Sequence, residues 1–181
     1  MSGPSRVIVG ASGSPGNLCA LRLAEQLARA YDAALVPVHT WKPPDGDIAD
    51  RRNPCTSLRC LWIEDAWQRL WNALDTAWGQ LPADLMVQPM IKRGQPGPVL
   101  TVIASNAGDL LVVGTGRRRT LTDVFSGSVS RYCLAHARCP VLAVPPTTVS
   151  PRASHGPLRW AFWHRTLTPG RILRDSNWTA V

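Results

Sequence analysis

Long hydrophobic runs are missing from this 181-residue chain. Its apolar stretches are as short as Val7–Val9 and Leu110–Val113, whereas a membrane-spanning helix needs about 20 consecutive apolar residues. The segment from Met1 to Gly10 also lacks the basic stretch followed by an apolar one that is typical of a secretory signal. These absences predict a soluble, cytoplasmic protein.

Paired cysteines of the C-x-x-C type are absent too. The chain has five cysteines, an odd number that, without a secretory signal, indicates reduced thiols rather than a disulfide framework. Cys55 and Cys60 lie close together in sequence, but no histidine nearby completes a metal-binding pattern. We therefore expect no metal site.

Lysine is scarce, since it occurs only at Lys42 and Lys92, while arginine supplies most of the net charge of +8. Half of that charge belongs to residues 1–146 and half to residues 147–181. No helix-turn-helix or zinc-finger pattern accompanies the charge. The chain is therefore not expected to bind a specific nucleic acid.

Apolar residues make up 45% of the chain, enough for a packed core, and they fall into alternating strand-like and helix-like segments. Such alternation predicts an α/β fold with a parallel sheet covered by helices on both faces. Pro37 and Pro89 lie inside two predicted strands, where each removes a backbone donor. The predicted strands are 5–10, 34–40, 85–92, 110–113 and 141–144, and the predicted helices are 15–31, 57–78, 98–106 and 126–137.

The segments divide the chain into an α/β domain, residues 5–146, and a C-terminal extension, residues 147–181. Tryptophans at helical spacing in 57–78 predict a face that packs on the sheet, not a ligand platform. The extension contains arginine, tryptophan and proline without strand-like alternation, so we predict that most of it is disordered. Its short aromatic stretch around Trp160 and Trp163 is not expected to bind a membrane.

Ligands of an open parallel sheet bind beyond the carboxyl ends of the strands, which here means the loops 10–16 and 114–128. The sequence has no P-loop pattern and no G-x-G-x-x-G turn. The second loop begins at Gly114 and ends with Gly127 and Ser128 at the predicted start of a helix, where backbone N–H groups favour an anion. The residues alone leave two interpretations open: a phosphate-bearing ligand, or a solvated basic loop.

The order of these pieces resembles the universal stress protein family over about Arg6 to Pro146. The resemblance rests on Val7–Pro15, on the G-x2-G-x9-G-[ST] loop, and on Gly127–Ser130 followed by Cys139–Val144. It implies an open five-stranded parallel sheet in the order 3-2-1-4-5, like that of the adenine nucleotide alpha hydrolases. It also implies ATP as cofactor, with Mg²⁺ as a further candidate, and a homodimer formed through the last strand, Val141–Val144.

The resemblance implies that adenine lies near the ends of the first two strands and that the phosphates lie on the glycine loop. Two positions depart from the family pattern: Arg117 replaces the middle glycine, although Gly116 precedes it, and Ser12 replaces an acid that could hold a metal. The implied nucleotide-binding residues are Ala11, Ser12, Thr40, Gly114, Arg117, Gly127, Ser128, Val129 and Ser130.

Three functions remain open at this point. The first is an ATP-binding stress protein that acts as a dimeric, non-enzymatic regulator. The second is a protein-interaction scaffold of the same fold that has lost its nucleotide. The third is a slow ATPase or a nucleotidyl-transferring relative, which the lack of a general base in the loops disfavours. No acid or nucleophile is placed to pair with His39 or His136, so we predict no catalytic residues.

Overall fold

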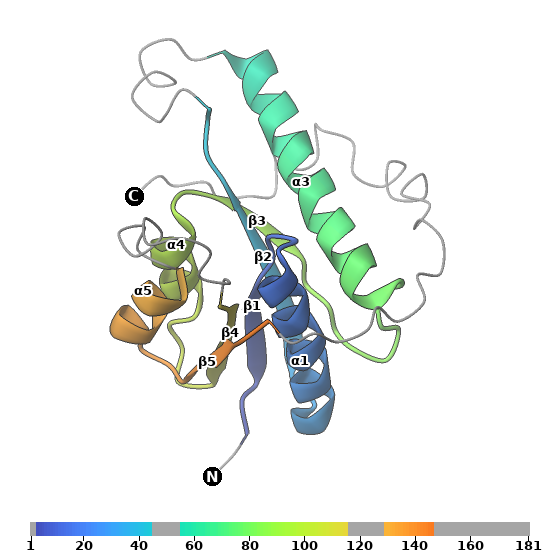
Figure 1. The fold of residues 1–181 in the computed structure, drawn as a ribbon, viewed down its shortest axis with the longest axis vertical. Coiled ribbons are helices and arrows are strands. Elements are labelled where there is room, and N and C mark those ends of the chain that lie inside the picture. The colour runs from blue at the N-terminus through green and yellow to red at the C-terminus, as the bar shows by residue number, and fades with distance from the viewer. Residues whose placement is uncertain (1–2, 45–54, 116–128, 147–181) are drawn as a thin grey trace.

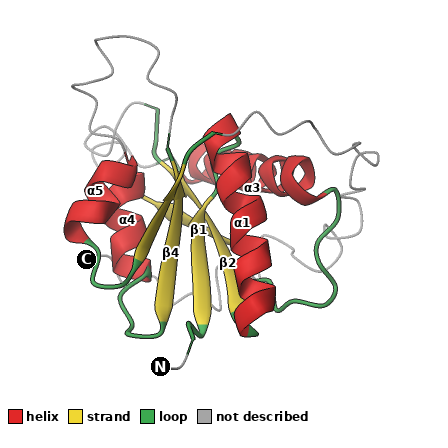
Figure 2. Ribbon diagram, turned by 60° about the horizontal axis from the view of Figure 1, so that its bottom comes forward, coloured by secondary structure: helices red, strands yellow, loops and turns green. Residues whose placement is uncertain are grey.

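The computed structural model describes residues 3–44, 55–115 and 129–146. Five parallel strands form one sheet in the order β3-β2-β1-β4-β5, as predicted (Figures 1 and 2). The predicted extension, residues 147–181, lies outside the described residues, so the domain division stays a prediction. The strands are β1 (Arg6–Gly10), β2 (Ala34–Trp41), β3 (Met90–Arg93), β4 (Asp109–Gly114) and β5 (Val141–Val144).

Helices cover both faces of the sheet (Figure 2). α1 (Pro15–Tyr31) and α3 (Thr56–Trp78) pack on one face, and α4 (Pro96–Ile103) and α5 (Val129–His136) pack on the other. β1 lies between the two layers. Its residues Val7–Val9 are fully buried and divide between two apolar clusters, one on each face, because successive side chains of a strand point to opposite sides. Among the described residues, no helix is both long and apolar enough to span a bilayer.

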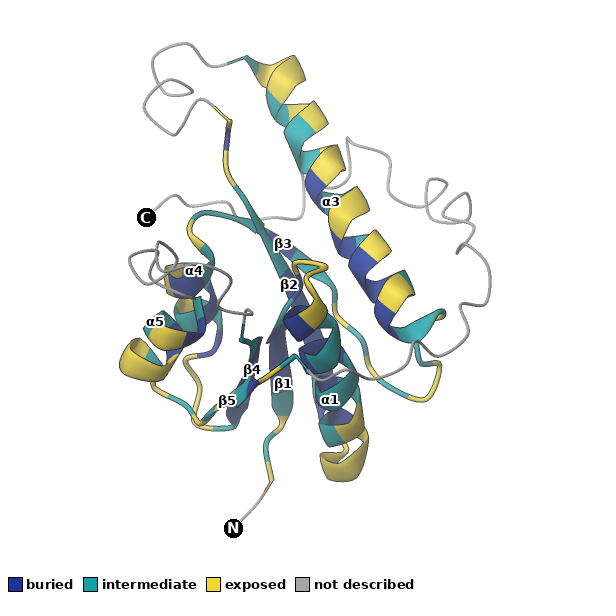
Figure 3. Ribbon diagram, in the orientation of Figure 1, coloured by how far each residue is buried: buried dark blue, intermediate teal, exposed yellow. Residues whose placement is uncertain are grey.

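The tryptophan-rich face of α3 packs against the sheet and α1, as predicted. Leu70 and Leu74 are buried, and Trp67, Trp71 and Trp78 pack against the same cluster. Figure 3 shows that the inward side of α3 is buried while its outer side is exposed. This stripe is therefore part of the core.

Pro37 shortens the third strand, which was predicted to run from 85 to 92. Leu35 in β2 donates its N–H to Met86 O (2.9 Å) and accepts from the Gln88 N–H (2.8 Å). Backbone groups of a parallel strand alternate between its two neighbours, so Pro37 turns its nitrogen toward the same segment and has no N–H to donate. A single bridge at Val87 is therefore followed by a gap before β3 begins.

The two prolines lie opposite each other in this gap. The bridge between Leu35 and Val87 and the pairing of Val38 with Met90 share one register, in which Pro37 faces Pro89. Because the Gln88 N–H points toward β2, the nitrogen of Pro89 points toward the open edge of the sheet, where a missing donor costs little. Pro37 thus interrupts the pairing of β2 with the edge strand, whereas Pro89 leaves that pairing unaffected.

A buried ion pair holds the amino ends of the central strands together. Arg6 of β1 and Asp109 of β4 are register partners, and the guanidinium contacts both carboxylate oxygens at 2.8 Å. Burial raises the pKa of Asp109, but hydrogen bonds from Arg6 and from the backbone N–H groups of Asn106 and Ser105 outweigh it, so the pKa lies below its usual value. This pair therefore stabilises the fold at neutral pH, and the contribution is lost as pH falls through the lowered pKa.

The same ion pair ends α4 earlier than the predicted Asn106. Arg6 donates to the carbonyl oxygen of Ile103 (3.2 Å), and the N–H of Asn106 donates to the Asp109 carboxylate (2.9 Å). The single N–H of Asn106 is then unavailable for a helical bond to Val102, and the helix ends at Ile103. At its other end α4 begins at Pro96, two residues before the prediction. The predicted start of the last helix, 126–128, lies outside the described residues.

We expect Arg6→Ala to lower the free energy of unfolding by about 3 kcal/mol at pH 7, because it leaves the Asp109 carboxylate buried without its partner. Urea denaturation measures this loss. The deficit should shrink toward pH 4, since protonation removes the unpaired charge. Arg69→Ala is the control, because the pair between Arg69 and Asp65 is exposed and should contribute less than about 0.5 kcal/mol. Equal effects of the two substitutions would contradict this account.

Candidate functional site

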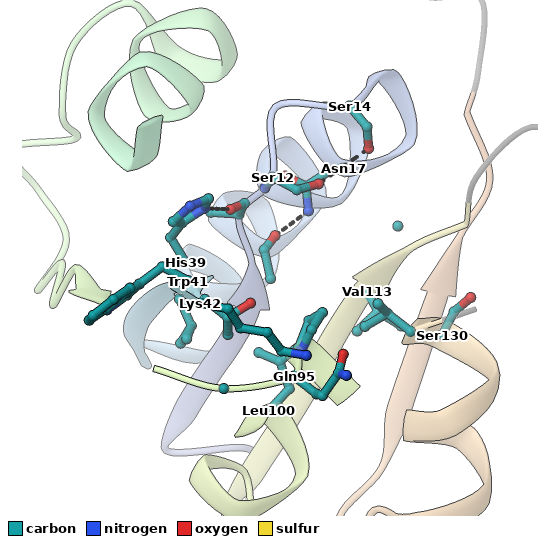
Figure 4. Close-up of a pocket in the computed structure, with 18 residues that line it drawn as sticks. Ser12, Ser14, Asn17, His39, Trp41, Lys42, Gln95, Leu100, Val113 and Ser130 are labelled. Carbon is teal, nitrogen blue, oxygen red and sulfur yellow. Dashed lines mark hydrogen bonds between the residues drawn. The ribbon is translucent and has the colours of Figure 1, made fainter. Parts of the chain in front are cut away.

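A cavity of about 560 Å³ lies beyond the carboxyl ends of β1, β2 and β4 (Figure 4). It opens where the chain order in the sheet reverses, between β1 and its two neighbours, the place where open α/β sheets bind ligands. Its apolar floor includes Val38, Leu100 and Val113, and its rim is polar. The rim includes Ser12, Ser14, Asn17, His39, Thr40, Lys42, Gln95 and Ser130.

Asn17 in the first turn of α1 holds the loop that forms one side of the cavity. Its side chain is buried, Oδ1 accepts from the backbone N–H of Ser12 (2.7 Å), and Nδ2 donates to the carbonyl oxygen of Gly10. Ser14 is the N-cap residue, as the sequence predicted, but its hydroxyl makes no capping bond and lies 3.4 Å from that of Ser12. The amide of Asn17, not the serine, therefore sets the path of the loop.

His39 at the end of β2 is fixed by a hydrogen bond to the same loop. Its Nδ1 lies 2.6 Å from the carbonyl oxygen of Ala11. A carbonyl can only accept, so Nδ1 carries a proton, and in the neutral form of the ring Nε2 is an acceptor. The ring lies between the large cavity and a smaller hollow of about 290 Å³ bordered by α3. His39 can thus accept a hydrogen bond from a ligand donor.

The third wall comes from a close contact between β4 and α1. A Cβ atom on Gly114 would lie 2.5 Å from backbone atoms of Gly16, and one on Gly16 would lie 2.3 Å from the carbonyl oxygen of Thr115. Real Cβ atoms do not approach so closely, so both positions require glycine. Gly114 is therefore constrained by the neighbouring backbone, and it also lines the cavity.

At the carboxyl ends of β2 and β3, a cation–π contact stiffens the rim. The Arg93 guanidinium lies 5.7 Å from the centre of the Trp41 ring, and the two residues are register partners on β2 and β3. The N–H of Gly94 donates to Trp41 O (2.9 Å) and continues this pairing past the strand. Lys42 follows Trp41, and Figure 4 shows its side chain extending toward Gln95.

Six of the nine predicted binding residues line this one cavity. They come from four separate segments of the chain. They are Ala11, Ser12, Thr40, Gly114, Val129 and Ser130. Arg117, Gly127 and Ser128 lie outside the described residues, so their role in binding stays a prediction.

Sequence reasoning missed the residues that shape the rim without belonging to a motif: Asn17, His39, Lys42 and Gln95. Asn17 carried one usable signal, because a polar side chain in the first helical turn often bonds to the loop before it. His39 was considered only as a catalytic group. Gln95 and Lys42 belong to loops that the fold brings together, and no local pattern marks them.

A family model for the universal stress protein family matches residues 4–145, and the chain belongs to this family. Universal stress protein Rv1996 of Mycobacterium tuberculosis is 27% identical over 136 residues, which cover 75% of this chain and 42% of that protein. The chain thus spans less than half the length of this curated relative. Universal stress protein Slr1101 of Synechocystis is 32% identical over 91 residues, covering 45% of this chain and 84% of the relative.

Solved structures share the fold. A universal stress protein crystallised in complex with cAMP is 23% identical, with a TM-score of 0.53 over 81% of this chain and 100% of that chain. At this identity the likeness establishes architecture, and it agrees with the strand order observed here. The ligand of this chain has to be argued from its own cavity.

Asn17→Ala should lower the free energy of unfolding by about 2 kcal/mol, because it removes two partly buried hydrogen bonds, one to the Gly10 carbonyl and one from the Ser12 N–H. Urea denaturation of the full chain measures the change. The matched control is Asn72→Ala on α3, an exposed asparagine whose loss should cost less than about 0.5 kcal/mol. If both variants unfold at the wild-type urea concentration, Asn17 does not hold the loop.

Proposed function

We propose that this chain binds an adenine nucleotide, ATP in the first instance, in the cavity beyond β1, β2 and β4. The bound nucleotide serves a regulatory role in the stress response and is not turned over. One observation carries the proposal: six residues implied by the family pattern, far apart in sequence, border a single cavity. Membership of the universal stress protein family and a relative of known structure in complex with cAMP support it.

The chemistry of the cavity suits a nucleoside. An apolar floor that includes Val38 and Leu100 provides a surface for a flat base, and hydroxyl, amide and imidazole groups on the rim provide hydrogen bonds. Nε2 of His39 is an acceptor available to an amino or hydroxyl group of the ligand. These features favour a nucleoside over a purely apolar ligand.

The proposal assigns no catalytic step to the cavity. Among its described lining residues none carries a carboxylate that could act as a general base. His39, the one imidazole on this rim, has Nδ1 bonded to a backbone carbonyl and no acid beside it in the described part of the chain. We therefore propose a binding protein, with hydrolysis absent or slow.

A homodimer through β5 is the second part of the proposal. β5 pairs only with β4 in the described sheet, so its other edge offers unpaired backbone groups to a second copy. Leu142 in this strand is 36% exposed, whereas Val141 and Ala143 pack toward the core. An edge strand that exposes leucine favours association with a twofold-related copy.

Thr40→Phe tests the location of the site. The larger side chain should fill part of the cavity and weaken ATP or cAMP binding at least about tenfold, the loss of 1.4 kcal/mol or more. Isothermal titration calorimetry on the full chain measures the affinity. Gln88→Phe is the control, since Gln88 is exposed and borders neither cavity. If wild-type protein binds neither nucleotide and carries none when purified, the scaffold function replaces this proposal.

Leu142→Glu should convert the dimer to a monomer, because two like charges would face each other across the paired β5 edges. Analytical ultracentrifugation measures the mass. Leu134→Glu is the control, an equally charged change at an exposed leucine of α5. A monomeric wild-type protein, or a dimer unaffected by Leu142→Glu, would contradict the proposed interface.

A further inference from the structure

We infer that the cavity takes its nucleotide as the metal-free anion, without Mg²⁺. The inference rests on the proposed function and concerns a property of the same site. Mg²⁺ that accompanies a nucleotide is usually held by one or two carboxylates of the protein together with the phosphates. The described residues of this cavity offer neutral polar groups and one lysine in place of carboxylates.

None of the described residues that line the cavity is acidic. Across the described chain, no three histidine, cysteine or acidic side chains come together in a way that could hold a metal ion. β4 itself begins with an acid, Asp109. This residue is paired with Arg6 at the amino end of the strand, away from the cavity. A carboxylate ligand for Mg²⁺ is thus missing from this part of the site.

Two neutral side chains of the cavity, Asn17 and His39, already use one of their polar atoms in a hydrogen bond to the backbone. Oδ1 of Asn17 accepts a hydrogen bond from Ser12, and Nδ1 of His39 carries the proton that it donates to Ala11. What remains are Nε2 of His39, a nitrogen that Mg²⁺ does not prefer, and the neutral oxygens of Ser12, Ser14, Thr40 and Gln95. Neutral oxygens alone hold Mg²⁺ poorly, because its water shell is costly to remove.

The charge on the rim also disfavours a cation. Lys42 lines the cavity and is exposed, and Figure 4 shows its side chain extending over the rim toward Gln95. An ammonium group repels a divalent ion and attracts an anionic ligand. A nucleotide without bound metal carries more negative charge than its Mg²⁺ complex and is therefore the better match for this rim.

The first experiment compares ATP and cAMP binding to the full chain by calorimetry, in EDTA and in saturating Mg²⁺. We expect ATP to bind at least as tightly in EDTA as in Mg²⁺, and cAMP to bind equally in both. ATP binding that requires Mg²⁺ would overturn the inference and leave the proposed function intact. Binding of neither nucleotide in either buffer would overturn both. Because the full chain is used, a metal ligand from residues 116–128, where the sequence has Asp123, would appear as an Mg²⁺ requirement.

The second experiment introduces the missing carboxylate. Ser12 is exposed on the rim, so Ser12→Asp adds an acid without disturbing the core. We expect this variant to bind ATP at least about tenfold more tightly in Mg²⁺ than in EDTA, because the metal now has a protein ligand. Ser12→Asn is the matched control, equal in size but uncharged, and should bind ATP without a preference for Mg²⁺. A Ser12→Asp variant with no preference for Mg²⁺ would count against the inference, provided that its thermal melting matches that of Ser12→Asn.

Discussion

The contact between the end of β4 and the first turn of α1 sets the geometry at the carboxyl ends of the strands. Gly114 and Gly16 meet backbone to backbone, with no room for a Cβ atom on either residue. This contact determines how deeply the start of α1 lies against the sheet. The loop before α1, held by Asn17, takes its position from that helix and forms one wall of the cavity.

The two ends of the sheet use polar groups in opposite ways. At the amino ends of the strands, Arg6 and Asp109 neutralise each other and tie β1, β4 and the end of α4 together. At the carboxyl ends, the described groups around the cavity are neutral hydrogen-bonding side chains and Lys42. Charge that stabilises the fold is thus kept apart from the groups that face a ligand, so changes at the rim leave the ion pair intact.

Membership of the universal stress protein family accounts for the sheet order and for the place of the cavity. It does not by itself determine which ligand binds, because one fold supports several sites. That choice depends on the groups particular to this chain, such as Ser12 in a position facing the cavity and His39 with its ring proton committed to Ala11. These residues make the site rich in hydrogen-bonding groups.

The sequence by itself determined the element types, the parallel sheet and most of the loops at the site, because periodic apolar residues and helix starts are local signals. Helix α1 and strand β5 have the predicted bounds for this reason. The rest depended on contacts between distant segments. Pro37 shortens the third strand only because the register turns its nitrogen toward that strand. The ring of His39 and the amide of Asn17 became parts of one site only when folding brought β1, β2 and α1 together, and no local pattern encodes such a meeting.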